Sequence, residues 1–161
     1  MATYLETWER SIKDPEGYWA EAAEKVYWNK KWEKVLDRSR EPFYRWFVGG
    51  ETNLCYNAID RHLTERGDQP AVIWESPETQ NQKVITYNEL YKEVNRFSAL
   101  LKKLGIEKGD RVIIYLPMIP EAVVAMLSCV RIGAIHSVVF AGFSYEVLAD
   151  RIDDAKPKLL I

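Results

Sequence analysis

Cysteine is scarce in this sequence. Cys55 and Cys129 are the two cysteines among the 161 residues, and no CxxC spacing occurs. A disulfide-held scaffold carries many cysteines and a structural zinc site needs clustered ligands, so both classes are excluded. Each cysteine lies in an apolar stretch, which predicts buried free thiols and a reducing compartment, the cytoplasm.

An excess of charge of one sign is also missing. Lys and Arg together number 22, against 24 for Asp and Glu, and the charges are balanced in both the first 50 residues and the remainder. Proteins that bind nucleic acid or anionic membranes by electrostatic attraction carry a basic patch or tail. We therefore expect no nucleic-acid partner.

Long apolar runs are absent as well. No stretch approaches the ~18 apolar residues of a transmembrane helix. The opening MATYLETWERS lacks the basic and then apolar pattern of a signal peptide. We expect no membrane partner. The hydrophobic content of 47% is still enough to bury a core, so the chain is predicted to be a folded, cytoplasmic protein.

The sequence is organised around residues 110–161. Apolar runs at 111–116 and 136–140 alternate with two helical segments, and a final KLLI completes a β-α-β-α-β pattern. Strands that read as continuous apolar runs are typical of a parallel sheet covered by helices. Ligands bind such sheets at the carboxyl ends of the strands, so function is expected first at the turn Phe140-Ala141-Gly142.

Tryptophan is concentrated near the N-terminus. Five of the six tryptophans lie within residues 1–46. Asp14-Pro15-Glu16 has the form of a helix start, with Asp as the cap and Pro at the first helical position. We interpret residues 1–50 as a mainly helical segment and residues 51–161 as the α/β domain. The aromatic side chains either clamp the segment onto the rest of the protein or form a partner surface.

Three elements are predicted between these two parts. Thr52 or Asn53 can cap a helix that runs to about Arg66. Residues 71–74 and 83–85 form a hairpin at the edge of the sheet. Thr86 and Glu89 have capping-box spacing at the start of a long helix that Gly105 ends.

The segment from Pro120 to Arg131 is almost entirely apolar. Its strongly polar members, Glu121, Ser128 and Arg131, fall on one narrow stripe of a helix. Nearly the whole circumference of this helix is therefore predicted to be buried. A chain of 161 residues provides that cover with difficulty, so we expect something else to cover the helix.

Several polar groups resemble catalytic or metal sites but fit structural roles better. Asp60 and His62 are two residues apart on a helix and point in different directions, and His136 has no partner spaced to make it a base. Asp153-Asp154 has no third ligand in view. Gly49-Gly50 marks a tight turn and lacks the GxxxxGK[ST] spacing of a phosphate loop. No catalytic residue and no metal ligand is predicted.

Three blocks of sequence together resemble the N-terminal part of the short-chain acyl-CoA synthetases, which belong to the AMP-forming, acyl-adenylate superfamily. The blocks are RWFVGGETNLCYNAIDRHL, the run from ITYNELYKEVNRF to VVFAGFS, and RIDDAKPKLLI. The first block, and EVNRFSALL within the middle block, are more similar to propionyl-CoA synthetases than to acetyl-CoA synthetases. The resemblance implies an incomplete part of an acyl-adenylate-forming fold.

The resemblance also implies a reaction and its cofactors. In this family a carboxylate, here propionate or acetate, reacts with Mg²⁺-bound ATP to give acyl-AMP and pyrophosphate, and the thiol of CoA then displaces AMP. The family's Ser/Thr/Gly-rich phosphate loop and catalytic lysine lie outside the matched blocks. We therefore expect the 161 residues to be inactive alone and to bind CoA weakly or not at all.

One binding site of the family falls inside the sequence. The family's aromatic-Gly-Gly turn contacts the adenine end of CoA, and it corresponds to Phe140, Ala141 and Gly142. Ala141 replaces the first glycine, which brings any special backbone angle there into question. The alternative interpretation is a plain turn between a strand and a helix.

Two hypotheses about partners follow. In the first, the chain is the opening piece of a carboxylate–CoA ligase whose partner is the missing C-terminal remainder. In the second, it is a non-catalytic interaction or assembly module that docks on an intact synthetase subunit through the helix at 120–131. In either case an exposed sheet edge and this apolar helix predict self-association.

Overall fold

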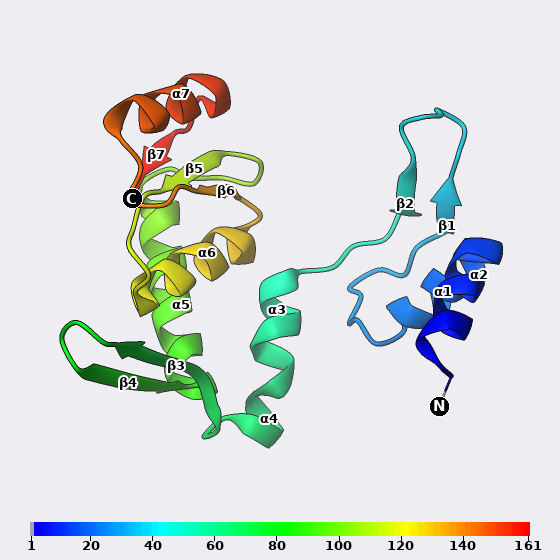
Figure 1. Ribbon diagram of the computed structural model, residues 1–161, viewed down its shortest axis with the longest axis horizontal. Coiled ribbons are helices and arrows are strands. Elements are labelled where there is room, and N and C mark those ends of the chain that lie inside the picture. The colour runs from blue at the N-terminus through cyan, green and yellow to red at the C-terminus, as the bar shows by residue number, and fades with distance from the viewer. Residues whose placement is uncertain (1) are drawn as a thin grey trace. The chain divides into compact units, whose positions relative to one another are not determined.

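The computed structural model describes residues 2–161. The chain forms two compact units, Met1–Asn53 and Leu54–Ile161. Each unit has its own helices and its own sheet structure, and the parallel sheet belongs to the second unit (Figure 1).

Two short helices open the first unit, α1 (Tyr4–Lys13) and α2 (Pro15–Ala23). Asp14 joins them. Its backbone ends α1, and its carboxylate accepts a hydrogen bond of 3.0 Å from the Gly17 N–H at the start of α2. The helix start predicted at this Asp-Pro pair is confirmed.

The remainder of the first unit contains a β hairpin, which the prediction of a mainly helical segment did not include. Strands β1 (Lys34–Asp37) and β2 (Arg45–Val48) pair antiparallel. Asp37 holds the hairpin closed, because its carboxylate accepts hydrogen bonds from the Ser39 N–H and the Arg45 Nε–H, both at 3.1 Å. The apolar and aromatic residues of both strands suit a pleated surface better than a helix.

Three partly buried aromatic rings pack together in the first unit. The rings of Trp28, Trp32 and Phe47 lie 4.9 to 5.3 Å apart, centroid to centroid. Gly50 passes close beneath them: a Cβ atom there would lie 2.8 Å from the Trp28 ring. Gly49 has a φ of +79°, which confirms the predicted tight turn. The aromatic cluster thus stabilises the hairpin within this unit.

The second unit begins with three short helical pieces where one helix was predicted. They are α3 (Leu54–Ala58), the 3₁₀ helix η1 (Asp60–His62) and α4 (Leu63–Arg66). Ile59 separates the first two, with a φ of −124° that leaves the helical range. Its side chain is 1% exposed and packs in a core cluster with Cys55. Burial of Ile59 accompanies the break in the helix.

Strands β3 (Pro70–Ser76) and β4 (Asn81–Thr86) confirm the predicted hairpin and extend it at both ends. They form a separate two-stranded sheet, so the expected position at the edge of the parallel sheet is wrong. The Trp74 Nε1–H donates a hydrogen bond of 2.7 Å to the Met118 carbonyl. This bond ties the hairpin to the segment that follows the central strand of the other sheet.

Helix α5 (Tyr87–Lys103) follows directly and confirms its predicted signals. Thr86 and Glu89 form both hydrogen bonds of the capping box. Gly105 lies just beyond the helix with a φ of +82°, as a residue that ends a helix often does.

The parallel sheet confirms the β-α-β-α-β prediction. Its elements are β5 (Arg111–Ile114), α6 (Pro120–Ile132), β6 (Ile135–Val138), α7 (Tyr145–Ala155) and β7 (Leu159–Leu160). The strand order is β6-β5-β7, with every pair parallel. The first strand in sequence is therefore the central strand in space.

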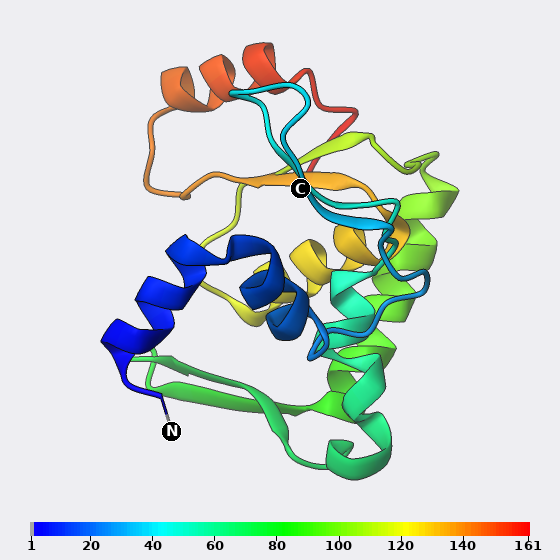
Figure 2. The same ribbon diagram turned by 90° about the vertical axis from the view of Figure 1, so that its right-hand side faces the viewer.

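Helices cover both faces of this sheet. Figures 1 and 2 show α7 on one face and α5 and α6 on the other. This arrangement follows from the strand order: the connections through α6 and α7 run in opposite directions, and right-handed crossovers then place their helices on opposite faces.

Helix α6 is covered inside the second unit. Within residues 120–132 the exposed side chain is Glu121, and the others are buried or partly buried. Ser128 donates a hydrogen bond of 3.1 Å to the Val94 carbonyl of α5, and Ser98 of α5 donates one of 3.3 Å to the Ser128 carbonyl. The predicted burial of most of this helix is confirmed, and α5 supplies part of the cover.

Candidate functional site

The chain builds the parallel sheet first to one side of β5, with β6, and then to the other side, with β7. The segment after β5 leads to α6 on one face, and the segment after the neighbouring β6 leads to α7 on the other (Figure 1). Two connections that part in this way leave a crevice at the carboxyl ends of the two strands, which is where open α/β sheets bind ligands. The predicted turn at Phe140-Ala141-Gly142 lies at this position.

The turn begins where the ladder between β5 and β6 ends. The Val139 N–H donates to the Ile114 carbonyl at 2.9 Å, and the Phe143 N–H donates to the Phe140 carbonyl at 3.0 Å. The second bond closes a four-residue turn over residues 140–143. A hydrogen-bonded turn that continues from a paired strand is a firm support for the side chains that it presents.

The turn presents two aromatic rings to solvent. Phe140 is 57% exposed and Phe143 is 46% exposed. Their ring centroids lie 5.7 Å apart and their planes are 87° apart, an edge-to-face arrangement. Two exposed aromatic rings that lie side by side are suited to stacking against a flat ligand.

Ala141 is compatible with the backbone of the turn. Among the described non-glycine residues, Phe47, Gln80 and Lys156 are those with positive φ, so Ala141 adopts an ordinary conformation. Gly142 is needed for a different reason. A Cβ atom on Gly142 would lie 2.4 Å from a ring carbon of Phe140. Glycine at this position provides space for the ring, while the first position of the family pattern tolerates alanine.

Tyr115 is a site residue that the sequence alone did not reveal. It follows β5, and its hydroxyl oxygen lies 3.0 Å from the Ala141 carbonyl oxygen and 2.9 Å from that of Phe143. The available signal was its place immediately after a central strand, at the carboxyl edge of the sheet. The contact itself joins residues distant in sequence.

The remaining polar candidates have structural surroundings. Asp60 pairs with Arg131 of α6, and the His62 ring lies 5.9 Å from the Tyr87 ring, so the two do not act as a dyad. His136 lies on β6, where burial lowers the pKa of its imidazole by disfavouring the charged form. Across residues 2–161, no group of three or more His, Cys, Asp or Glu side chains could hold a metal ion.

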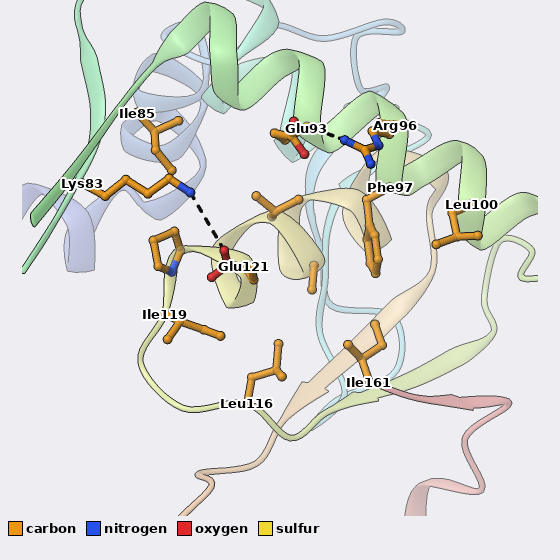
Figure 3. Close-up of a pocket in the computed structure, with 13 residues that line it drawn as sticks. Lys83, Ile85, Glu93, Arg96, Phe97, Leu100, Leu116, Ile119, Glu121 and Ile161 are labelled. Atoms are coloured by element: carbon orange, nitrogen blue, oxygen red, sulfur yellow. Dashed lines mark ion pairs between the residues drawn. The ribbon is translucent and has the colours of Figure 1, made fainter. Parts of the chain in front are cut away.

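A pocket of about 630 Å³ lies between α5, α6 and the carboxyl ends of β5 and β7 (Figure 3). Its interior is mostly apolar and includes Phe97, Leu116 and Ile161. Lys83 and Glu121 face one another at its mouth with 4.0 Å between charged atoms. The lining comes from segments that are far apart in sequence, which is why sequence patterns did not indicate this pocket.

A helix that crosses a bilayer must be long and apolar. Across residues 2–161, no helix combines the length and the apolar character that a membrane crossing demands.

Two family descriptions match the chain in succession. Residues 4–58 match the family described as acetyl-coenzyme A synthetase N-terminus, and residues 59–161 match the family described as AMP-binding enzyme. The match over residues 59–161 alone covers more than half of the chain.

Individual relatives agree over nearly the whole sequence. Acetyl-coenzyme A synthetase of Syntrophobacter fumaroxidans is 52% identical over 161 residues, and propionate–CoA ligase of Salmonella typhimurium is 48% identical over 159 residues. Each alignment covers 99% of this chain and 25% of the relative. These identities do not separate acetate from propionate enzymes, so the expected closeness to propionyl-CoA synthetases remains a prediction.

A solved structure shows the same fold. Acetoacetyl-CoA synthetase from Streptomyces lividans superposes with a TM-score of 0.91 at 30% sequence identity, over 99% of this chain and 25% of that one. The chain thus spans about a quarter of the length of the relatives that it matches. It belongs to the AMP-binding enzyme family, and its 161 residues correspond to the N-terminal quarter of the short-chain acyl-CoA synthetases.

Proposed function

We propose that this chain is the opening part of an AMP-forming short-chain carboxylate–CoA ligase. The observation that carries this proposal is the 52% identity over 99% of the chain to an acetyl-coenzyme A synthetase. The reaction has two steps. A carboxylate oxygen attacks the α-phosphorus of ATP and pyrophosphate leaves. The sulfur of CoA then attacks the acyl carbon, and AMP leaves as the thioester forms.

The contribution of the described residues is to CoA binding. The exposed Phe140 ring, on a turn fixed to β6, offers a flat surface for the adenine end of CoA. Stacking of a base on an aromatic ring contributes about 1 to 3 kcal/mol. A contribution of this size by itself corresponds to weak binding, so we expect the 161 residues alone to bind CoA weakly.

Mg²⁺ does not fit the residues described. Family resemblance implies this ion together with ATP, yet residues 2–161 contain no cluster of carboxylates or other metal-binding side chains. No step of the reaction is therefore assigned to a metal bound by these residues.

The proposed substrate is a short carboxylate such as acetate or propionate. The proposed location is the cytoplasm, in keeping with two buried free thiols.

Binding to fragments of CoA tests the assignment of the turn. Saturation-transfer NMR on the 161-residue chain should show signals from the adenine protons of CoA and of adenosine 3′,5′-bisphosphate, and none from pantetheine. Phe140→Ala should reduce the affinity about 5- to 150-fold, the equivalent of 1 to 3 kcal/mol. Phe43→Ala is the matched control, since Phe43 is 79% exposed in the first unit.

Two results would contradict the proposal. One is the absence of adenine signals with the unmodified chain. The other is equal affinity for the Phe140→Ala and Phe43→Ala variants.

A separate test concerns catalysis. Release of pyrophosphate by the 161 residues, with ATP and acetate or propionate, should equal that of a control without protein. Clear turnover would show that the chain needs no further residues for catalysis.

A further inference from the structure

We propose that Tyr115 is a positioning residue, whose hydroxyl fixes the turn at 140–143 so that the Phe140 ring can stack on adenine. This inference rests on the proposed function of the turn. It assigns a part in coenzyme recognition to the residue that follows the central strand, without any contact between that residue and the ligand.

The backbone of Tyr115 is itself well anchored. It directly follows β5, and its N–H donates a hydrogen bond of 2.8 Å to the Ile161 carbonyl on the β7 side. Its side chain is partly buried and reaches toward the segment that follows β6, on the other side of β5. Tyr115 therefore connects the carboxyl ends of all three strands.

The Tyr115 hydroxyl contacts the backbone carbonyl groups on both sides of Gly142. It lies 3.0 Å from the Ala141 carbonyl oxygen and 2.9 Å from the Phe143 carbonyl oxygen. A phenol has one hydrogen to donate, and two acceptors at nearly equal distance can share it. The two carbonyls on either side of Gly142 are thus held toward a single donor atom.

The hydrogen bond that closes the turn is separate from the hydrogen bonds that attach the turn to Tyr115. The Phe143 N–H donates to the Phe140 carbonyl within the turn, and this bond does not involve Tyr115. Loss of the hydroxyl should therefore leave the turn folded but less firmly attached to β5. Because Phe140 lies against Gly142, a shift of the tip changes the direction in which the ring faces.

Tyr115→Phe isolates this effect, because it keeps the ring and removes the donor. The affinity for adenosine 3′,5′-bisphosphate should fall about 3- to 12-fold, as expected for one hydrogen bond of ordinary strength. The urea midpoint should fall slightly, because the folded chain loses the same hydrogen bond. In the unliganded protein, hydrogen exchange at the Phe143 amide should become faster, while exchange within β5 stays unchanged. Tyr4→Phe is the control, since Tyr4 is 85% exposed.

A double-mutant cycle separates positioning from direct contact. If Tyr115 acts through the Phe140 ring, Tyr115→Phe should weaken binding in the original chain and have no further effect on Phe140→Ala. Equal losses in both backgrounds would overturn the inference, as would unchanged affinity of Tyr115→Phe.

The outcomes also distinguish the inference from the function on which it rests. If Phe140→Ala weakens binding and Tyr115→Phe does not, the proposed function stands and the role of Tyr115 is refuted. If the unmodified chain shows no adenine signal, or Phe140→Ala binds as the original does, the proposed function fails and the role of Tyr115 fails with it.

Discussion

Arg131 and Asp60 form a two-pronged ion pair, with 3.0 Å from Nη1 to Oδ1 and 2.6 Å from Nη2 to Oδ2. Their side chains are 19% and 16% exposed. The Arg131 guanidinium also lies 5.3 Å from the centre of the Tyr91 ring. The pair connects η1 to α6 in an environment with little water.

Loss of one partner of this pair should destabilise the second unit. Asp60→Ala leaves the positive charge of Arg131 without its carboxylate, at a cost of about 3 kcal/mol in the free energy of unfolding. Urea unfolding followed by circular dichroism measures the change. Glu65→Ala, which removes an exposed carboxylate on α4, should change it by about 0.5 kcal/mol or less. Similar losses in the two variants would contradict the structural role of the pair.

The thiol of Cys129 should make stability fall at alkaline pH. The side chain is fully buried, and burial raises its pKa from an ordinary 9.0 to about 11. Between these two values the unfolded chain releases the proton and the folded chain keeps it, so stability present below pH 9 is lost as the pH rises to 11. The loss amounts to about 2 to 3 kcal/mol.

Comparison with Cys129→Ala isolates the contribution of this thiol, since the Cys55 thiol, whose pKa is also raised by burial, is present in both proteins. The variant should show a shallower fall in unfolding free energy between pH 9 and 11, measured by urea titration at a series of pH values. Parallel curves for the two proteins would argue against a protonated thiol in the folded state.

Gly142→Ala should separate stability from binding. The added methyl group meets the Phe140 ring at 2.4 Å, and this ring is 57% exposed and can rotate away. The free energy of unfolding should therefore change by about 0.5 kcal/mol or less, while affinity for adenosine 3′,5′-bisphosphate falls. Ala141→Gly restores the family pattern and should leave the affinity unchanged. Since Ala141 has an ordinary φ, the added freedom of glycine in the unfolded chain should lower the free energy of unfolding by about 0.4 to 1 kcal/mol. Retained affinity in Gly142→Ala would show that the orientation of the ring is unimportant.

A charge on β6 should suppress association between chains. This strand is at one edge of the three-stranded sheet, and Ile135 on it is 55% exposed. Exposed edge strands pair with other chains unless charge or shape prevents it. Ile135→Glu, placed opposite Arg111, should lower the average mass in sedimentation velocity at high protein concentration. If the unmodified chain sediments as a monomer, or if the variant associates equally, the edge is not an association surface.

Signals confined to a few neighbouring residues were read correctly from the sequence. The capping box of Thr86 and Glu89 needs residues three apart, and it forms as predicted. The alternation of apolar runs in residues 110–161 likewise predicted the succession of strands and helices along the chain, because the strands of a parallel sheet tend to be continuous apolar runs. The turn at the end of β6 was found for the same reason.

Features that depend on distant residues were missed. Residues 34–48 contain a hairpin whose closing pair, Asp37 and Arg45, has no local signature in the sequence. The contact from Tyr115 to Ala141 spans two strands, and the pocket near Phe97 combines several segments. Strand order decides which of these residues meet, and sequence periodicity does not carry that information.

The central place of β5 has a consequence for synthesis of the protein. Translation delivers β5 before either of its neighbours, because β6 and β7 both follow it in the chain. β6 can cover one side soon afterwards, but Val112 and Ile113 pair on the other side with Leu159 and Leu160. Until those two residues leave the ribosome, the middle of the sheet has an open flank. During that interval the unpaired side of β5 can pair with other chains, which favours aggregation.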